Sequence, residues 1–168
     1  MTKYYGKYRG TVMQNVDPEQ MGRIQVMVPD VSGLLPSSWA MPCVPIAGKS
    51  SGTFVVPQIG AGVWIEFEQG DPDYPVWTGG FWGSAAEVPA LARAGNPASP
   101  SIVLASGLQN IIAISDLPGP TGGIMLTSTT GAMIVVNDIG ITISNGKGAS
   151  IVLTGPTVTI NNGALVVT

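Results

Sequence analysis

The sequence predicts an all-β protein with a small barrel in its N-terminal half and a stack of short strands in its C-terminal half. Short runs of β-branched residues recur along the whole chain, 23 glycines and 14 prolines punctuate them, and no segment shows helical periodicity. Apolar residues make up 45% of the 168 residues, so the chain can bury enough surface to offset the entropy of folding.

Charged side chains are scarce and unevenly distributed. They make up 10% of the chain, against roughly 25% in an average globular protein, which predicts that much of the surface contacts other protein. Residues 1–93 hold six of the seven bases and eight of the ten acids, leaving Asp116, Asp138 and Lys147 beyond. We therefore predict two domains, residues 1–83 and 107–168, joined by a linker over residues 84–106 that is rich in proline and small residues.

The first domain contains six strand signals, which are Tyr8–Gln14, Arg23–Val28, Trp39–Ile46, Phe54–Val56, Val63–Glu68 and Val76–Trp82. Apolar residues alternate with polar ones in two of them, which predicts strands with one buried face; the predicted inward residues are Ile24, Val26, Val28, Val63, Ile65 and Phe67. Short antiparallel strands at this spacing indicate a Greek-key barrel of the OB type.

Two turns in this domain are predicted from proline and aspartate. Asp17-Pro18 and Gly70-Asp71-Pro72 lie between strand signals. Proline fixes φ near −65°, and an aspartate side chain can accept a hydrogen bond from the turn backbone, so both should be sharp turns.

The second domain is a succession of short β-branched runs, which are Ile111–Ser115, Gly123–Ser128, Ala132–Asn137, Ile139–Ser144, Ser150–Thr154, Thr157–Asn161 and Ala164–Val167. Each marks one apolar face, through the pairs Ile124/Leu126, Ile134/Val136, Ile141/Ile143, Ile151/Leu153 and Val158/Ile160. A segment of this size without aromatic residues or a covering helix does not easily build its own core. We expect three identical chains, wound about one axis, to turn these faces inward.

Several ordered blocks of the first domain resemble the phage baseplate assembly protein V and the VgrG-like central spike proteins of contractile tails and secretion systems. These blocks are Asp17-Pro18, Gly22-Arg23-Ile24-Gln25-Val26-Met27-Val28-Pro29, Trp39-Ala40-Met41-Pro42, Pro57-Gln58-Ile59-Gly60 and the run from Val63 to Trp77. The second domain is also similar to the spikes of that family, through Gly123-Ile124-Met125-Leu126 and Asn145-Gly146-Lys147-Gly148-Ala149.

The resemblance implies a structural protein, the central spike at the baseplate of a contractile injection system or phage tail. Its OB-fold domain would sit on the baseplate hub at the end of the tail tube. Three C-terminal segments would intertwine into a β-helix or β-prism that is driven through the target membrane. We accordingly expect a homotrimer within a virion tail or an extracellular or cell-associated particle, synthesised in the cytoplasm without a signal peptide.

The chain departs from that family at its end. Many phage spikes of the family end in histidines that hold an iron ion, whereas this chain has no histidine. We therefore expect a separate small tip protein, resembling the PAAR-type proteins of related systems, on the end formed by residues 164–168. The chain also has no room for the lysozyme domain that some members insert.

The sequence predicts no enzyme and no catalytic, cofactor-binding or metal site. Without histidine, a His-based acyl-transfer site is excluded. Solvated carboxylates are the expected state of Glu66, Glu68, Asp71 and Asp73, rather than a glycosidase pair or a Ca²⁺ site. The glycines from Gly140 to Gly148 lack the spacing of a phosphate loop and predict a hairpin turn. Cys43, the only cysteine, is expected to be a buried, inert thiol.

Two other functions compete with that of a spike. OB barrels often bind single-stranded nucleic acid, and Tyr4, Tyr5, Tyr8 and Trp64 could stack on bases, but an acidic chain with seven basic residues predicts no nucleic-acid partner. The alternative to a spike is a trimeric β-solenoid tail fibre or adhesin that binds or degrades carbohydrate. A fibre needs no OB adaptor, so the first domain separates the two hypotheses.

Overall fold

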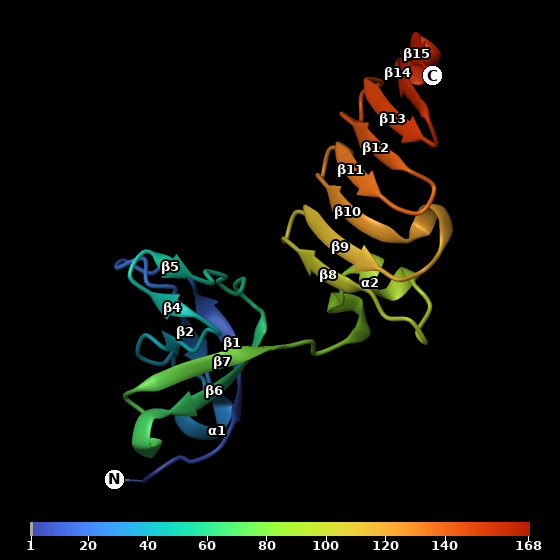
Figure 1. The fold of residues 1–168 in the computed structure, drawn as a ribbon. Coiled ribbons are helices and arrows are strands. Elements are labelled where there is room, and N and C mark those ends of the chain that lie inside the picture. The colour runs from blue at the N-terminus through green and yellow to red at the C-terminus, as the bar shows by residue number, and fades with distance from the viewer. Residues whose placement is uncertain (1) are drawn as a thin grey trace. The chain divides into compact units, whose positions relative to one another are not determined.

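The computed structural model describes residues 2–168 and divides between Glu87 and Val88 into two compact units (Figure 1). Within these residues the fold is mostly β, with two short α-helices and a few 3-10 turns. The prediction of an all-β chain is confirmed to this extent.

The N-terminal unit is built on a five-stranded sheet in the order β2-β1-β6-β7-β3. Its strands are β1 (Tyr8–Gln14), β2 (Gln25–Met27), β3 (Met41–Pro42), β6 (Gly62–Phe67) and β7 (Pro75–Phe81). All neighbours are antiparallel except β3 and β7, which pair in parallel. The unit also contains a short hairpin of two-residue strands, β4 (Ala47–Gly48) and β5 (Ser51–Gly52). It is completed by the helix α1 (Pro29–Ser32) and the 3-10 turn η1 (Glu68–Gly70).

The core of this unit contains all six residues that the alternation predicts to face inward, together with Val12, Ala40 and Trp77. Fully or almost fully buried side chains come from β1, β2, β6, β7 and their flanks, and they are Val12, Ile24, Val26, Val28, Ala40, Val63, Ile65, Phe67 and Trp77. Both predicted turns are also present, since Gln20 N–H donates to the Asp17 carbonyl and Tyr74 N–H to the Asp71 carbonyl. Period-two patterning therefore places the core correctly.

The middle of the unit differs from the prediction. Only Met41–Pro42 of the predicted strand Trp39–Ile46 forms a named strand, and Phe54–Val56 forms none. Pro42 and Pro45 have no N–H to donate, so a continuous ladder across this segment is not available. The chain instead makes the β4–β5 hairpin, in which Thr53 N–H donates to the Ile46 carbonyl.

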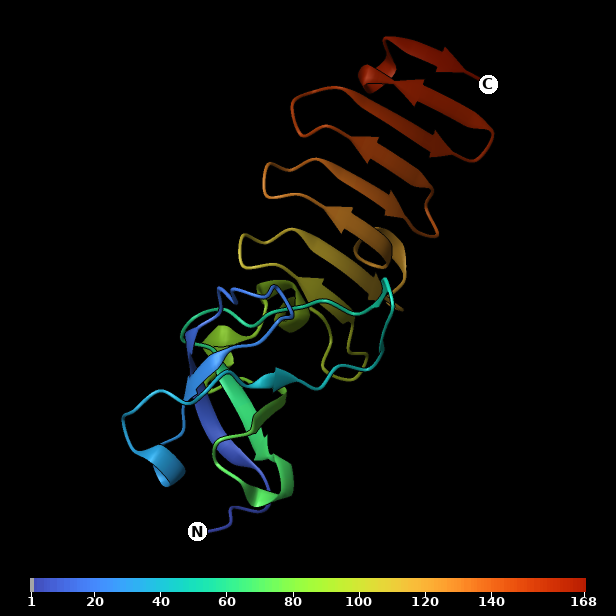
Figure 2. The same cartoon turned by 90° about the vertical axis from the view of Figure 1, so that its left-hand side faces the viewer.

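The C-terminal unit is an antiparallel meander in which eight strands follow one another in sequence order (Figure 2). Its strands are β8 (Ile102–Ala105), β9 (Ile111–Ser115), β10 (Gly123–Thr127), β11 (Met133–Val136), β12 (Ile141–Ser144), β13 (Ser150–Thr154), β14 (Thr157–Ile160) and β15 (Leu165–Val167). The sheet of one chain is open, with β8 and β15 as its edges.

Residues 84–106, which the sequence predicts as a linker, contain regular structure. They include the 3-10 turn η2 (Ala85–Glu87), the helix α2 (Ala90–Ala94) and strand β8. Strand β8 pairs with β9 over four residues, so the sheet begins before residue 107. The sequence pattern that indicates strand β8 is short, because its apolar run lies between Pro100 and Ser106.

Candidate functional site

One face of the sheet in the C-terminal unit carries apolar side chains that no other part of the unit covers. Strand pairing aligns two columns of side chains across all eight strands. The first column is Ile102, Ile114, Ile124, Val136, Ile141, Leu153, Val158 and Val167, and the second is Leu104, Ile112, Leu126, Ile134, Ile143, Ile151, Ile160 and Leu165. Every member is Ile, Leu or Val, so this surface, the aliphatic face, carries no polar side chain in either column.

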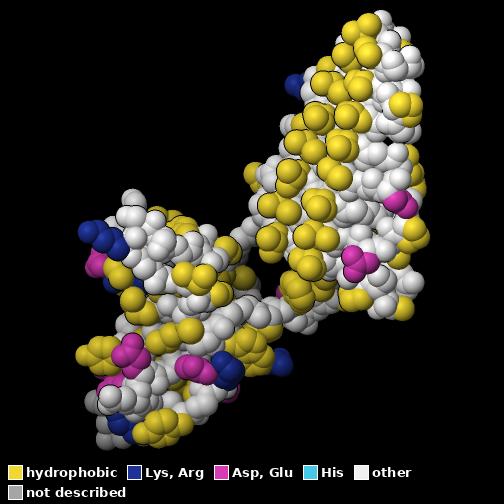
Figure 3. Space-filling view, in the orientation of Figure 1, with side chains coloured by type: hydrophobic (Ala, Val, Ile, Leu, Met, Phe, Trp, Pro, Cys, Tyr) yellow, Lys and Arg dark blue, Asp and Glu magenta, His cyan; other side chains and the backbone are white. Residues whose placement is uncertain are grey.

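Most side chains of the aliphatic face are exposed in the single chain. Ile124 is 50% exposed, and residues of strands in the middle of the stack, such as Ile134 and Ile151, are still 41% and 40% exposed. Figure 3 shows hydrophobic side chains running along the length of this unit. A continuous apolar surface of this kind is typical of an interface with other protein.

The opposite face of the sheet is partly buried within the single chain. Its central column runs through Ala113, Met125, Val135, Thr142 and Val152. Ala113 and Val135 are buried within the chain, at 6% and 8% exposure. The face that lacks cover is thus the one that carries the pairs predicted from the sequence, extended by residues of β8, β9 and β15 that those pairs did not include. The alternation of Ile102 and Leu104 is the signal that could have found β8.

Three connections on one edge of the sheet share the same five-residue geometry, which the sequence reading did not identify as a repeat. In each, the first residue's side-chain oxygen accepts the N–H of the fifth residue, and the pairs are Ser106 with Asn110, Ser128 with Ala132, and Asn145 with Ala149. Adjacent loops also contact one another, since Thr129 N–H donates to Asn110 Oδ1. The loops therefore stack in step with the strands and hold the register of the columns.

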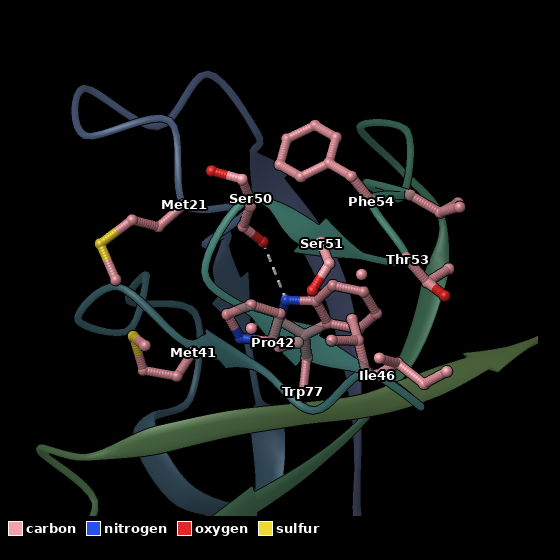
Figure 4. Close-up of a pocket in the computed structure, with 15 residues that line it drawn as sticks. Met21, Met41, Pro42, Ile46, Ser50, Ser51, Thr53, Phe54 and Trp77 are labelled. Atoms are coloured by element: carbon pink, nitrogen blue, oxygen red, sulfur yellow. Dashed lines mark hydrogen bonds between the residues drawn. The ribbon is translucent and has the colours of Figure 1, made fainter.

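The N-terminal unit exposes a second apolar feature, an open pocket of about 660 Å³ beside the β4–β5 hairpin. Figure 4 shows Met21, Met41 and Phe54 arranged around Trp77. The Trp77 indole N–H donates to the Gly22 carbonyl oxygen at 3.1 Å, which fixes the ring in the wall of the pocket. Phe54 on the rim is 70% exposed.

A buried ion pair shapes the turn after β1. Arg23 donates from Nη2 to Asp17 Oδ1 at 2.7 Å, and the N–H groups of Glu19, Met21 and Arg23 also donate to the Asp17 carboxylate. The Arg23 guanidinium, with support from these three N–H groups, holds the pKa of Asp17 far below its ordinary value. This cluster explains structurally why an aspartate stands before Pro18.

The aromatic residues considered for base stacking are mostly engaged in packing. The rings of Tyr4 and Tyr8 lie 6.1 and 5.6 Å from the ring of Phe67, and Trp64 lies 4.9 Å from Phe81. The Arg9 guanidinium lies over both Trp64 and Phe81. Tyr5 is the member of the proposed set that is largely exposed, at 72%.

Glu66 and Asp71, two of the acidic residues considered for a catalytic or Ca²⁺ site, each lie near a lysine side chain. Lys7 Nζ lies 2.7 Å from Glu66 Oε1, and Lys3 Nζ lies 3.8 Å from Asp71 Oδ2. Among residues 2–168, no three His, Cys, Asp or Glu side chains are grouped as a metal site would require. Residues 145–149 form the predicted hairpin turn between β12 and β13, whereas Gly140 lies in the preceding connection, between β11 and β12, so the glycines from Gly140 to Gly148 do not share one turn.

The prediction for Cys43 is wrong, because the thiol is exposed. Cys43 follows β3 and lies between Pro42 and Pro45, in the irregular segment that leads to the β4–β5 hairpin rather than in the core. The general preference of free cysteine for the interior does not apply where the local backbone runs along the surface.

In the part of the chain that the structure covers, no helix is long and apolar enough to cross a membrane.

Comparison with known protein families matches both units. Residues 8–82 match the Type VI secretion system/phage-baseplate injector OB domain, and residues 101–166 match the phage baseplate V C-terminal trimerisation domain. A search of curated proteins returned no match. The matches confirm the predicted family and assign the aliphatic face to a domain whose described role is trimerisation. The chain therefore belongs to the phage baseplate V family, as a structural baseplate or spike component with an OB domain followed by a trimerisation domain.

Proposed function

We propose that three copies of this chain form the central, membrane-piercing spike of a contractile injection system or contractile phage tail. The observation that carries this proposal is the aliphatic face, on which two columns of Ile, Leu and Val cross all eight strands of the C-terminal unit. Three such faces turned toward one axis, as a β-prism or intertwined β-helix, would bury one another.

The expected result is a rigid rod. Eight strands stacked at about 4.8 Å would span roughly 34 Å along the axis. Because the core of the rod would be shared among the chains, no protomer could unfold its needle independently of the others. The loops stacked at the strand ends, joined by the hydrogen bond from Thr129 N–H to Asn110 Oδ1, would add stiffness along the axis.

The N-terminal unit supports the spike hypothesis over the fibre hypothesis. Its match is to an injector OB domain, and an adaptor of this kind has no role in a carbohydrate-binding fibre. We propose that it docks on the baseplate hub at the end of the tail tube. The apolar pocket around Trp77 and the exposed Phe54 supply contact surface for such a partner.

At the opposite end of the chain we propose a separate tip protein resembling the PAAR type. Leu165, Val166 and Val167 are each at least half exposed, and β15 is an edge strand of the eight-stranded sheet. An apolar strand edge favours a partner that continues the sheet. The proposed role of the chain is mechanical and requires no catalytic site.

Light scattering on the purified chain tests the trimer. A mass of three chains supports the proposal, and a folded monomer at micromolar concentration contradicts it. Intact particles test the rest: mass spectrometry should find a small stoichiometric tip protein, and electron microscopy should show density beyond Thr168. Particles that remain active with density ending at Thr168 would show that the chain itself forms the point.

A further inference from the structure

The charged side chains of the C-terminal unit lie on opposite edges of its sheet. Beyond Arg93 the chain has only three, Asp116, Asp138 and Lys147. Asp116 lies in the connection β9–β10 and Asp138 in the connection β11–β12, whereas Lys147 lies in the connection β12–β13. Successive connections of an antiparallel meander alternate between its two edges, so the acids share one edge and the lysine lies on the other. Figure 3 shows acidic and basic side chains at opposite margins of this unit.

Local hydrogen bonds order the two loops that carry Asp138 and Lys147. The Asp138 carboxylate accepts the Gly119 N–H at 2.9 Å, which ties it to the neighbouring β9–β10 connection. Lys147 N–H donates to Asn145 Oδ1, and this bond fixes the loop that presents the lysine. Asp138 and Lys147 are both exposed, and neither forms an ion pair among the described residues.

Cyclic symmetry brings the two edges together. If three aliphatic faces turn toward one axis, each corner of the assembly joins the acidic edge of one chain to the basic edge of the next, because such contacts are head-to-tail. Each chain supplies one sign of charge to each corner, so all three corners are complementary. An arrangement that placed like edges together would bring like charges together instead.

The positions along the stack select one acid as the partner. Asp138 precedes β12 and Lys147 follows it, so their loops differ in height by one strand spacing, about 4.8 Å. The connection of Asp116 differs from that of Lys147 by three spacings, about 14 Å. That separation exceeds the Debye length of about 10 Å at 0.1 M salt.

We propose that Lys147 of each chain forms an ion pair with Asp138 of the neighbouring copy, and that these three pairs set the corners of the trimer. The inference rests on the trimer proposed above. It identifies the partner surface of each sheet edge as the opposite edge of a second copy of this chain.

A double-mutant cycle on the full chain tests the pair. Lys147→Asp and Asp138→Lys should each lower the midpoint of thermal dissociation of the trimer by about 2–4 °C at 20 mM salt. The double variant restores opposite charges, so its midpoint should lie above the value that adding the two single effects predicts. This coupling should shrink at 500 mM salt.

Asp116→Lys is the matched control, since it changes the net charge by the same amount as Asp138→Lys. Combined with Lys147→Asp, it should give additive effects. Because Asp138 also binds Gly119 N–H, a neutral cycle of Lys147→Gln and Asp138→Asn covers the case in which the lysine variant misfolds; asparagine keeps an acceptor oxygen.

The outcomes separate the two proposals. A wild-type trimer without coupling between positions 147 and 138, or with coupling between 147 and 116 instead, overturns the ion pair and leaves the spike proposal intact. A wild-type chain that is a folded monomer overturns both.

Discussion

Replacing Ile151 with aspartate should abolish trimer assembly. Ile151 lies on the aliphatic face, where strand pairing sets it between Ile143 and Ile160. It is 40% exposed in the single chain, so the remaining surface is available for burial in a trimer. In the proposed assembly, three copies of the introduced carboxylate would point into one dry interior.

Two contributions set the expected magnitude. Full burial of an isoleucine contributes about 1.5–3 kcal/mol, so the 40% still exposed corresponds to about 0.6–1.2 kcal/mol per chain. An unpaired buried carboxylate costs several kcal/mol after relaxation, so three copies cost on the order of 10 kcal/mol per trimer. The charge thus dominates the loss, and it corresponds to about seven powers of ten in the association constant.

Sedimentation or light scattering at micromolar concentration measures the effect directly. Thr154→Asp is the matched control, because Thr154 lies on the same strand, faces the other side of the sheet and is exposed. The control should remain trimeric. Acidification toward pH 4 should partly restore assembly of the Ile151 variant, since a protonated carboxyl is less costly to bury. If the Ile151 variant assembles with an unchanged melting temperature, the aliphatic face does not line the trimer interior.

Three further predictions concern the two units. Asp17→Asn should lower the melting temperature of the N-terminal unit at pH 7. Because the folded state lowers the pKa of Asp17, its ion pair stabilises the fold fully above the ordinary aspartate pKa of about 4, and this contribution decreases progressively as the pH falls below that value toward the lowered pKa. The melting temperatures at pH 7 and pH 3 should therefore differ less in the variant than in the wild type. Residues 1–87 alone should give a folded β-rich monomer by circular dichroism and sedimentation, because their core is complete within one chain; a disordered fragment would contradict the unit boundary. Gly146→Ala should destabilise the C-terminal unit by more than Gly148→Ala in thermal melts. A Cβ at Gly146 would lie 2.6 Å from the Gly131 carbonyl carbon, whereas at Gly148 only the positive φ disfavours a side chain. Equal effects would mean that the adjacent loops do not stack.

Much of the fold could be predicted because the signals are local. The bounds of β1, β9 and β13 agree with the predicted strands at both ends, and the alternation around Ile24 and Ile65 identifies the core of the N-terminal unit. These features depend on a period of two along a strand and on turn residues at its ends. The failures lie where prolines interrupt the pattern, as between Trp39 and Val56, or where a strand is short, as at β8.

The sequence by itself determined that every strand of the C-terminal half has one apolar side and that this half lacks residues to cover it. Only the tertiary structure decided that these sides align into two unbroken columns, because register depends on which strands pair and not on either strand alone. The same holds for the opposite placement of Asp138 and Lys147, which follows from the order of the meander. It also holds for the exposed Cys43, whose position is set by the path of the chain beyond β3 rather than by the preference of the residue.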